Sequence, residues 1–176
     1  MPTQILSHPG AGEYAPYYDT YIAPVAGQNA LATLVTQLDA LDPLRSLDDA
    51  RLLHRYAPDK WSVKEAIGHI TDAERIFACR MLRIARGDKT PLPGFDQQPY
   101  VETANSNRLP IGVLVDSFRA TRAATIALAN EIDGDAWLRT GTASGFTVSA
   151  RALAYIITGH ATHHIAILRD RYGMPV

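Results

Sequence analysis

The sequence is poor in cysteine: Cys79 is the only one among 176 residues. No intrachain disulfide can therefore form, and a hydrophobic core must stabilise the fold. The length allows this, because a chain of this size buries a large core without cross-links. We expect a reduced, cytoplasmic protein in which Cys79, set in an apolar helical pattern, is a small buried residue.

Long apolar runs and an excess of charge of one sign are also missing. No stretch approaches the roughly 18 consecutive apolar residues that indicate a membrane-spanning helix. The 17 basic and 18 acidic side chains leave a formal charge of −1, which provides no broad positive surface for a phosphate backbone. The composition therefore predicts neither a membrane nor a nucleic-acid partner.

The first residues lack the pattern of a targeting segment. They contain several prolines and glycines, but neither the basic start nor the apolar run of a secretory signal. We predict an extended N-terminal segment over residues 1–20 and a single domain over residues 21–176, without an internal linker, repeat or low-complexity tract.

What the sequence does contain is helical periodicity. Apolar residues recur at spacings of three and four, which predicts long helices over residues 28–40, 63–86, 111–131 and 150–171. Ser62 and Glu65 form a capping-box pattern at the start of the second of these helices.

Shorter elements are predicted between the long helices. A further short helix is expected over residues 45–56, and one helical turn over residues 98–104. Residues 140–147 have the composition of a turn, and we expect no paired strand.

Prolines interrupt the segment that joins the second and third long helices. Pro91, Pro93 and Pro99 exclude a long helix over residues 89–109, which predicts an ordered crossing connection. Four helices with one long connection predict an all-α four-helix bundle with a crossover between helices 2 and 3. The core of such a bundle is a common place for a metal site.

Two histidines lie within the apolar stripe of the last helix. On a helical wheel of about 100° per residue, His164 lies within about 40° of His160, as do Leu153, Ile156 and Ile167. Imidazoles at positions i and i+4 project from adjacent turns and can share one cation. The glutamate that a zinc protease has directly after the first histidine is absent, because Ala161 occupies that position, so a protease is not indicated.

A third ligand is expected from another helix, and His69 in the second long helix is the candidate. Its helical neighbours Ala66 and Ala73 are small and leave room for an ion. Three histidines leave coordination positions open for water or substrate. The alternatives are that these are ordinary core histidines without a metal, or that His160 pairs with His163 at i, i+3.

Four other side chains are candidates for supporting roles at this site. Asp72 could orient a ligand or move a proton, although a solvated or helix-pairing role is more common for such a residue. Trp61 and Tyr100 are candidate pocket walls, and Arg80 is a candidate pocket residue, while aromatic side chains more often simply pack.

At these residues the sequence resembles the DinB/YfiT-like superfamily of metal-dependent enzymes. The resemblance lies in three blocks that occur together: WSVKEAIGHITDAERIFACRMLRIARGD from Trp61 to Asp88, PLPGFD from Pro91 to Asp96, and RALAYIITGHATHHIAILRDRY from Arg151 to Tyr172. It covers nearly the whole chain from about residue 20. It implies an up-down-down-up four-helix bundle, often dimeric, that binds nickel or zinc through His69, His160 and His164.

The resemblance also implies a class of activity. Characterised relatives include transferases and isomerases that use a low-molecular-weight thiol such as bacillithiol or mycothiol, and others are described as hydrolases. We therefore expect a divalent-metal-dependent transferase or hydrolase acting on a small-molecule substrate, as a homodimer. Ala161 stands where relatives often carry an acidic residue, so no general base is assigned there. The alternative is a non-catalytic metal- or ligand-binding stress-response protein.

Overall fold

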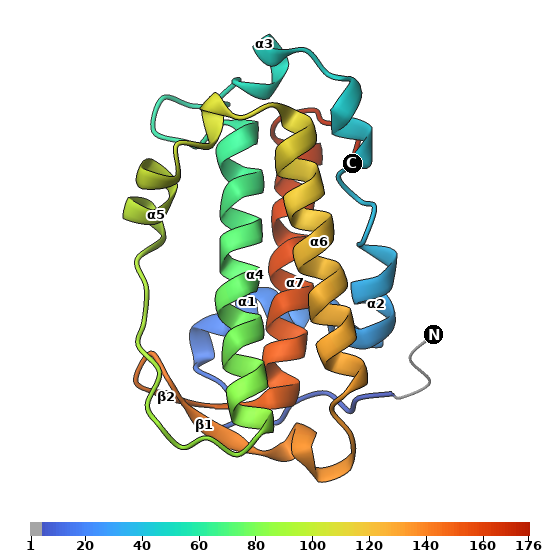
Figure 1. Cartoon of the computed structure of the whole chain (residues 1–176), viewed down its shortest axis with the longest axis vertical. Coiled ribbons are helices and arrows are strands. Elements are labelled where there is room, and N and C mark those ends of the chain that lie inside the picture. The colour runs from blue at the N-terminus through green and yellow to red at the C-terminus, as the bar shows by residue number, and fades with distance from the viewer. Residues whose placement is uncertain (1–4) are drawn as a thin grey trace.

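The computed structural model describes residues 5–176 and forms a bundle of four helical segments (Figure 1). These segments are α2 (Ala30–Thr36), α4 (Val63–Ala85), α6 (Ile111–Asn130) and α7 (Ala150–Asp170). In Figure 1, α4 and α6 run downward side by side, while α2 and α7 run upward. The predicted all-α, up-down-down-up bundle is therefore confirmed.

The two long helices that carry the candidate histidines begin as their sequences predict. Ser62 caps α4 through a capping box: its hydroxyl accepts from the Glu65 N–H at 3.1 Å, and the Glu65 carboxylate accepts from the Ser62 N–H at 2.7 Å. Ser149 caps α7 by accepting from the Ala152 N–H at 3.0 Å. Gly87, with a φ of 85°, follows the last turn of α4.

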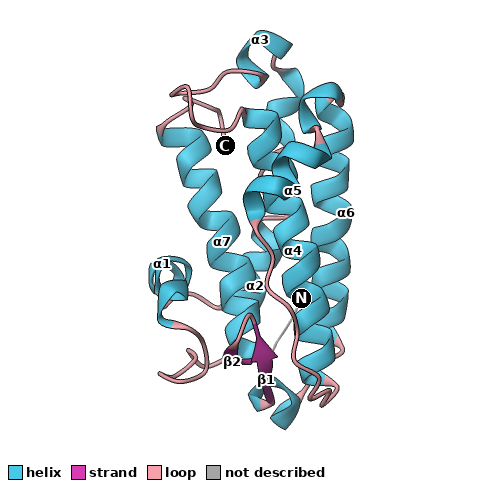
Figure 2. Ribbon diagram, turned by 90° about the vertical axis from the view of Figure 1, so that its left-hand side faces the viewer, coloured by secondary structure: helices cyan, strands magenta, loops and turns pink. Residues whose placement is uncertain are grey.

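The crossover between α4 and α6 lies over the seam between α4 and α7. It contains the short helix α5 (Gln97–Ala104), which Figure 2 shows in front of this seam. The helix α1 (Asp19–Ile22) packs against α7 on the other side of the same seam. These two short elements frame the face of the bundle where the histidines lie.

The N-terminal half is more broken than the sequence predicts. The first long helix covers only residues 30–36, because the chain leaves the helix at Gln37. The 3₁₀-helix Asp42–Ser46 and the single turn α3 (Asp49–Leu52) replace the helix expected over residues 45–56. Within the segment predicted as extended, residues 16–18 form a 3₁₀ turn and α1 begins at Asp19.

The expectation of no paired strand was wrong. Strands β1 (Thr140–Ala143) and β2 (Phe146–Ser149) form an antiparallel hairpin directly before α7. Its two turn residues, Ser144 and Gly145, have φ values of 53° and 82°, the left-handed pair that two-residue hairpins require. Leu92 of the crossover pairs with this hairpin by donating to the Thr142 carbonyl at 2.9 Å.

The expected burial of Cys79 was also wrong, since its side chain is exposed. The core-facing side of α4 includes Phe77 and Met81. Cys79 lies about 200° around the helix from Phe77, on the outer side. Within residues 5–176 no helix is both long enough and apolar enough to cross a membrane.

Candidate metal centre

The structure brings the three predicted histidines together in the seam between α4 and α7. Each offers one ring nitrogen, and these three atoms lie within 4.8 Å of one another. His69 Nε2 and His160 Nε2 are 3.1 Å apart. The exposed fractions of His69, His160 and His164 are 4%, 4% and 9%. Among the described residues this is the one group of histidine, cysteine and carboxylate side chains close enough to share an ion.

Burial keeps all three imidazoles uncharged. It lowers the pKa of His69 to about 4 and is the main cause that lowers the pKa of His164 to about 3. The pKa of His160 is also well below its ordinary value, through burial first and then through the neighbouring histidines. Neutral imidazoles keep a free electron pair near pH 7, so the donor set fits a borderline divalent cation such as nickel or zinc.

His163 is not a member of this group. It is half-buried, and its ring lies 5.4 Å from the ring of Tyr21. His160 and His164 therefore lie on the inner side of α7 and His163 lies at its edge, as the helical wheel predicts.

A glycine next to the site lets α1 approach α7. A Cβ atom on Gly159 would lie 1.9 Å from the backbone oxygen of Tyr21, so only glycine fits at this contact. The close approach brings the Tyr21 ring to 5.1 Å from the His160 ring. Sequence reasoning missed Tyr21, because α1 is too short to show a periodic pattern.

Trp61, a candidate pocket wall, lies beside the histidines. Its ring centroid is 4.6 Å from that of His69, and it stacks at 6.4 Å and 26° on His164. Its indole Nε1 donates to Gln98 Oε1 on α5 at 3.1 Å. Trp61 thus connects the start of α4 to the crossover at the site itself.

Tyr100 and Arg80 line neither of the two cavities that reach the histidines. Tyr100 is 47% exposed and its ring contacts Phe95 at 5.4 Å. Arg80 is buried and donates to the Pro93 carbonyl at 2.6 Å and to Ser144 Oγ at 3.2 Å. Arg80 therefore fixes the crossover to the hairpin, and through it the loop that carries Phe95.

Asp72 is not brought to the histidines. Its carboxylate accepts from Arg75 at 2.9 Å, and both residues line a separate cavity together with Ser117 of α6. Asp72 lies at about −60° from His69 on the helical wheel, which turns it toward α6 instead of α7. Asp72 therefore pairs with Arg75 of its own helix, as one of the alternatives considered for it proposed. Asp72 supplies no proton-transfer group at the three histidines.

Two cavities reach the histidines and share no lining residue. The first, of about 390 Å³, is the aromatic chamber, lined by Tyr17, Tyr21, His69, Phe77, Phe95, Asp96, Gln97 and His160. The second, of about 270 Å³, is the Trp61 chamber, lined by Tyr56, Asp59, Lys60, Trp61, Ala66, Gln98, His164, Ile167 and Tyr172. Both are near the lower end of the size range of small-molecule sites.

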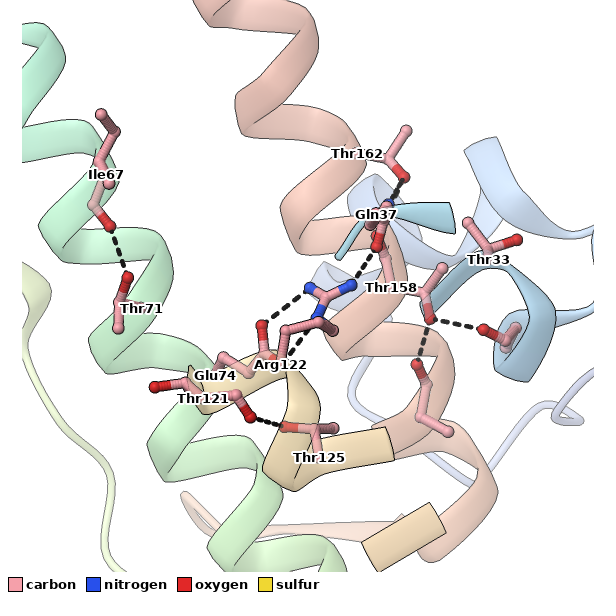
Figure 3. Close-up of polar contacts among 12 residues, drawn as sticks. Thr33, Gln37, Ile67, Thr71, Glu74, Thr121, Arg122, Thr125, Thr158 and Thr162 are labelled. Atoms are coloured by element: carbon pink, nitrogen blue, oxygen red, sulfur yellow. Dashed lines mark hydrogen bonds and ion pairs between the residues drawn. The ribbon is translucent and has the colours of Figure 1, made fainter. Parts of the chain in front are cut away.

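A buried polar network lies in the bundle core (Figure 3). Arg122 of α6 pairs with Glu74 of α4 and donates to Gln37 Oε1. Gln37 Nε2 in turn donates to the Thr158 carbonyl at 3.1 Å and to Thr162 Oγ at 2.8 Å, both on α7. The network thus joins the two helices that carry the histidines to α6 and to the end of α2.

Comparisons with known proteins bear on this arrangement. The family model of the DinB superfamily matches residues 31–168. YfiT from Bacillus subtilis, described as a probable metal-dependent hydrolase with an unusual four-helix bundle topology, is similar with a TM-score of 0.70 and 17% identity, over 98% of this chain and 97% of that chain. A mycothiol-dependent maleylpyruvate isomerase is similar with a TM-score of 0.64 and 19% identity, over 84% of this chain and 60% of that chain. No curated protein matches the sequence.

Proposed function

The chain belongs to the DinB superfamily, and from this premise we propose that His69, His160 and His164 bind one divalent metal ion, nickel or zinc. The observation that carries the proposal is the convergence of three buried, neutral imidazole nitrogens within 4.8 Å. A divalent ion held there lowers the pKa of a bound thiol or water and so supplies a nucleophile near neutral pH.

We propose further that the protein is a metal-dependent transferase that uses a low-molecular-weight thiol of the bacillithiol or mycothiol type. Its variant is a hydrolase, in which water takes the place of the thiol. Two separate cavities at the histidines support the transferase, because transfer needs room for two small molecules. The mycothiol-dependent isomerase of similar fold supports the same choice. Cytoplasmic location and homodimer formation belong to the proposal as well.

The chain's own residues would hold the reactants rather than carry protons. The three histidines are buried apart from the surface that lines the two cavities. Trp61 holds the rings of His69 and His164 from the side of the crossover. The hydrogen bonds of the core network keep α4 and α7 in a fixed register, which positions the ligands on both helices.

One observation favours a second candidate, a non-catalytic metal- or ligand-binding protein of the stress response. Among the described residues no carboxylate or thiol lies close enough to the three histidines to share an ion with them, and Asp72 faces another cavity. A protein that binds metal but neither binds thiols nor turns over an electrophile or an ester would support this candidate.

Metal content of tag-free protein tests the site. We expect about one nickel or zinc per chain in the wild type, and a loss of metal in both His160→Ala and His164→Ala. The matched control is His163→Ala, since this neighbouring histidine is outside the group and the variant should keep its metal. Wild-type protein that stays metal-free after reconstitution with divalent ions would refute the proposal.

A further inference from the structure

The aromatic chamber and the Trp61 chamber meet at the histidines from two directions. His69 and His160 line the first, and His164 lines the second. The start of α5 lies between them, since Gln97 faces the aromatic chamber and Gln98 the other. A hydrogen bond from Trp61 to Gln98 holds the start of α5 in this position. Two ligands could therefore reach the histidines at the same time without sharing a cavity.

The walls of the aromatic chamber are rings from three different parts of the chain. Tyr17 and Tyr21 come from the N-terminal turns, Phe77 from α4 and Phe95 from the crossover. The Phe77 and Phe95 rings are 6.3 Å apart at an angle of 67°. This is the edge-to-face geometry in which aromatic rings attract one another, so a further ring placed among them gains the same type of contact.

The charges around the chamber argue against a charged ligand. Among the described residues no lysine or arginine lines it, whereas the Asp96 carboxylate does, which disfavours an anion. The guanidinium of Arg80 already lies 5.8 Å from the Phe77 ring centroid and 5.9 Å from that of Phe95. The Phe77 and Phe95 rings thus already have a cation–π partner in Arg80. A cationic ligand would have to displace Arg80 from these rings, which disfavours its binding.

We infer that the aromatic chamber binds an uncharged aromatic group of the substrate, and that the Trp61 chamber stays open for the second reactant. This inference rests on the proposed function, because the substrate's donor atoms would be anchored on the ion that His69, His160 and His164 would hold. Its new content is the chemical class of the substrate and the cavity that selects it.

Two hydroxamates test the inference on the metal-loaded protein. Acetohydroxamate and benzohydroxamate chelate a divalent ion through the same two oxygens, and only the second carries a ring. After correction for their affinities for the free ion, we expect benzohydroxamate to bind about tenfold more tightly in calorimetry, since its ring gains aromatic contacts and is buried. Phe95→Ala should remove most of this preference, and so should Tyr17→Ala. The Tyr17 side chain is largely exposed, so the second substitution should leave the fold intact.

Tyr56→Ala is the matched control, because this aromatic side chain lines the Trp61 chamber. It should leave the preference for the ring unchanged. Equal binding of the two hydroxamates by the wild type would overturn the inference while leaving the metal site standing. Loss of the preference in Tyr56→Ala instead of Phe95→Ala would overturn it too, since the ring would then bind in the other chamber. Failure of the protein to hold any metal would overturn both the proposed function and the inference.

Discussion

Arg122 donates from Nε and from Nη2 to the two carboxylate oxygens of Glu74, at 2.8 Å in each case, and the two side chains are 0% and 2% exposed. An ion pair at this depth has lost its hydration on both sides, so each partner depends on the other. Because Gln37 extends the pair to α7, the same contact also fixes the helix that carries His160 and His164.

Removing one partner of this pair should strongly destabilise the fold. We expect Glu74→Ala to lower the free energy of unfolding by about 3–5 kcal/mol, because it leaves the Arg122 charge buried without a partner. Urea denaturation measures this. The double variant Glu74→Leu with Arg122→Met should lose less than Glu74→Ala, since no charge is left in the core.

The control for the ion pair is Arg75→Ala, which removes an exposed partner of Asp72 on the same helix. It should change the free energy of unfolding by less than about 1 kcal/mol. An effect of Glu74→Ala as small as that of Arg75→Ala would show that the core pair does not stabilise the bundle.

Gly159→Ala should separate α1 from α7. The added methyl group would meet the backbone oxygen of Tyr21 at 1.9 Å, and backbone cannot move aside as a flexible side chain can. We expect a loss of about 1–3 kcal/mol in thermal or urea unfolding, together with a weaker contact between Tyr21 and His160. Gly27→Ala is the matched control, because nothing lies within 4 Å of its added Cβ. Equal stability of the two variants would contradict this account.

The histidines could be predicted from sequence because helical spacing alone decides which side of a long helix a residue faces. His160 and His164 share an apolar stripe, and His69 lies on the buried side of α4. The same spacing could not tell which neighbouring helix each side meets. Asp72, three residues after His69, therefore faces α6 and a separate cavity instead of the histidines.

The aromatic chamber could not be predicted, because its walls come from short or irregular segments. Tyr21 reaches the site through the close contact at Gly159, and Phe95 through a loop that Arg80 holds. Neither contact leaves a periodic pattern. The hairpin did leave a signal in Ser144 and Gly145, but its strands have four residues each and mostly polar, small side chains.

Binding of nickel should quench the fluorescence of Trp61. The ring of this residue contacts both His69 and His164, so an ion held by the histidines would lie close to it. The second tryptophan, Trp137, is buried in the short helix before the hairpin and serves as an internal control. We expect quenching on nickel titration of Trp137→Phe and little quenching in Trp61→Phe. The opposite pattern would place the ion elsewhere in the chain.

The N-terminal segment should make the fold sensitive to acid. The Glu13 carboxylate accepts from Arg151 at the start of α7, from Ser149 Oγ at 2.7 Å and from the Gly10 N–H at 2.9 Å. These contacts, that with Arg151 first, lower the pKa of Glu13 from 4.5 to about 2. The unfolded chain therefore takes up this proton at a higher pH than the folded chain does.

The stability that Glu13 contributes is consequently complete above about pH 4.5 and is lost as the pH falls toward 2. We expect the melting temperature of the wild type to fall more steeply between these values than that of Glu13→Gln, which has no proton to take up at this position. Glu131→Gln, which removes a largely exposed carboxylate paired with Arg86, is the control and should follow the wild type. If Glu13→Gln and the wild type lost stability in parallel over this range, the bond from Glu13 to Arg151 would not tie the N-terminal segment to α7.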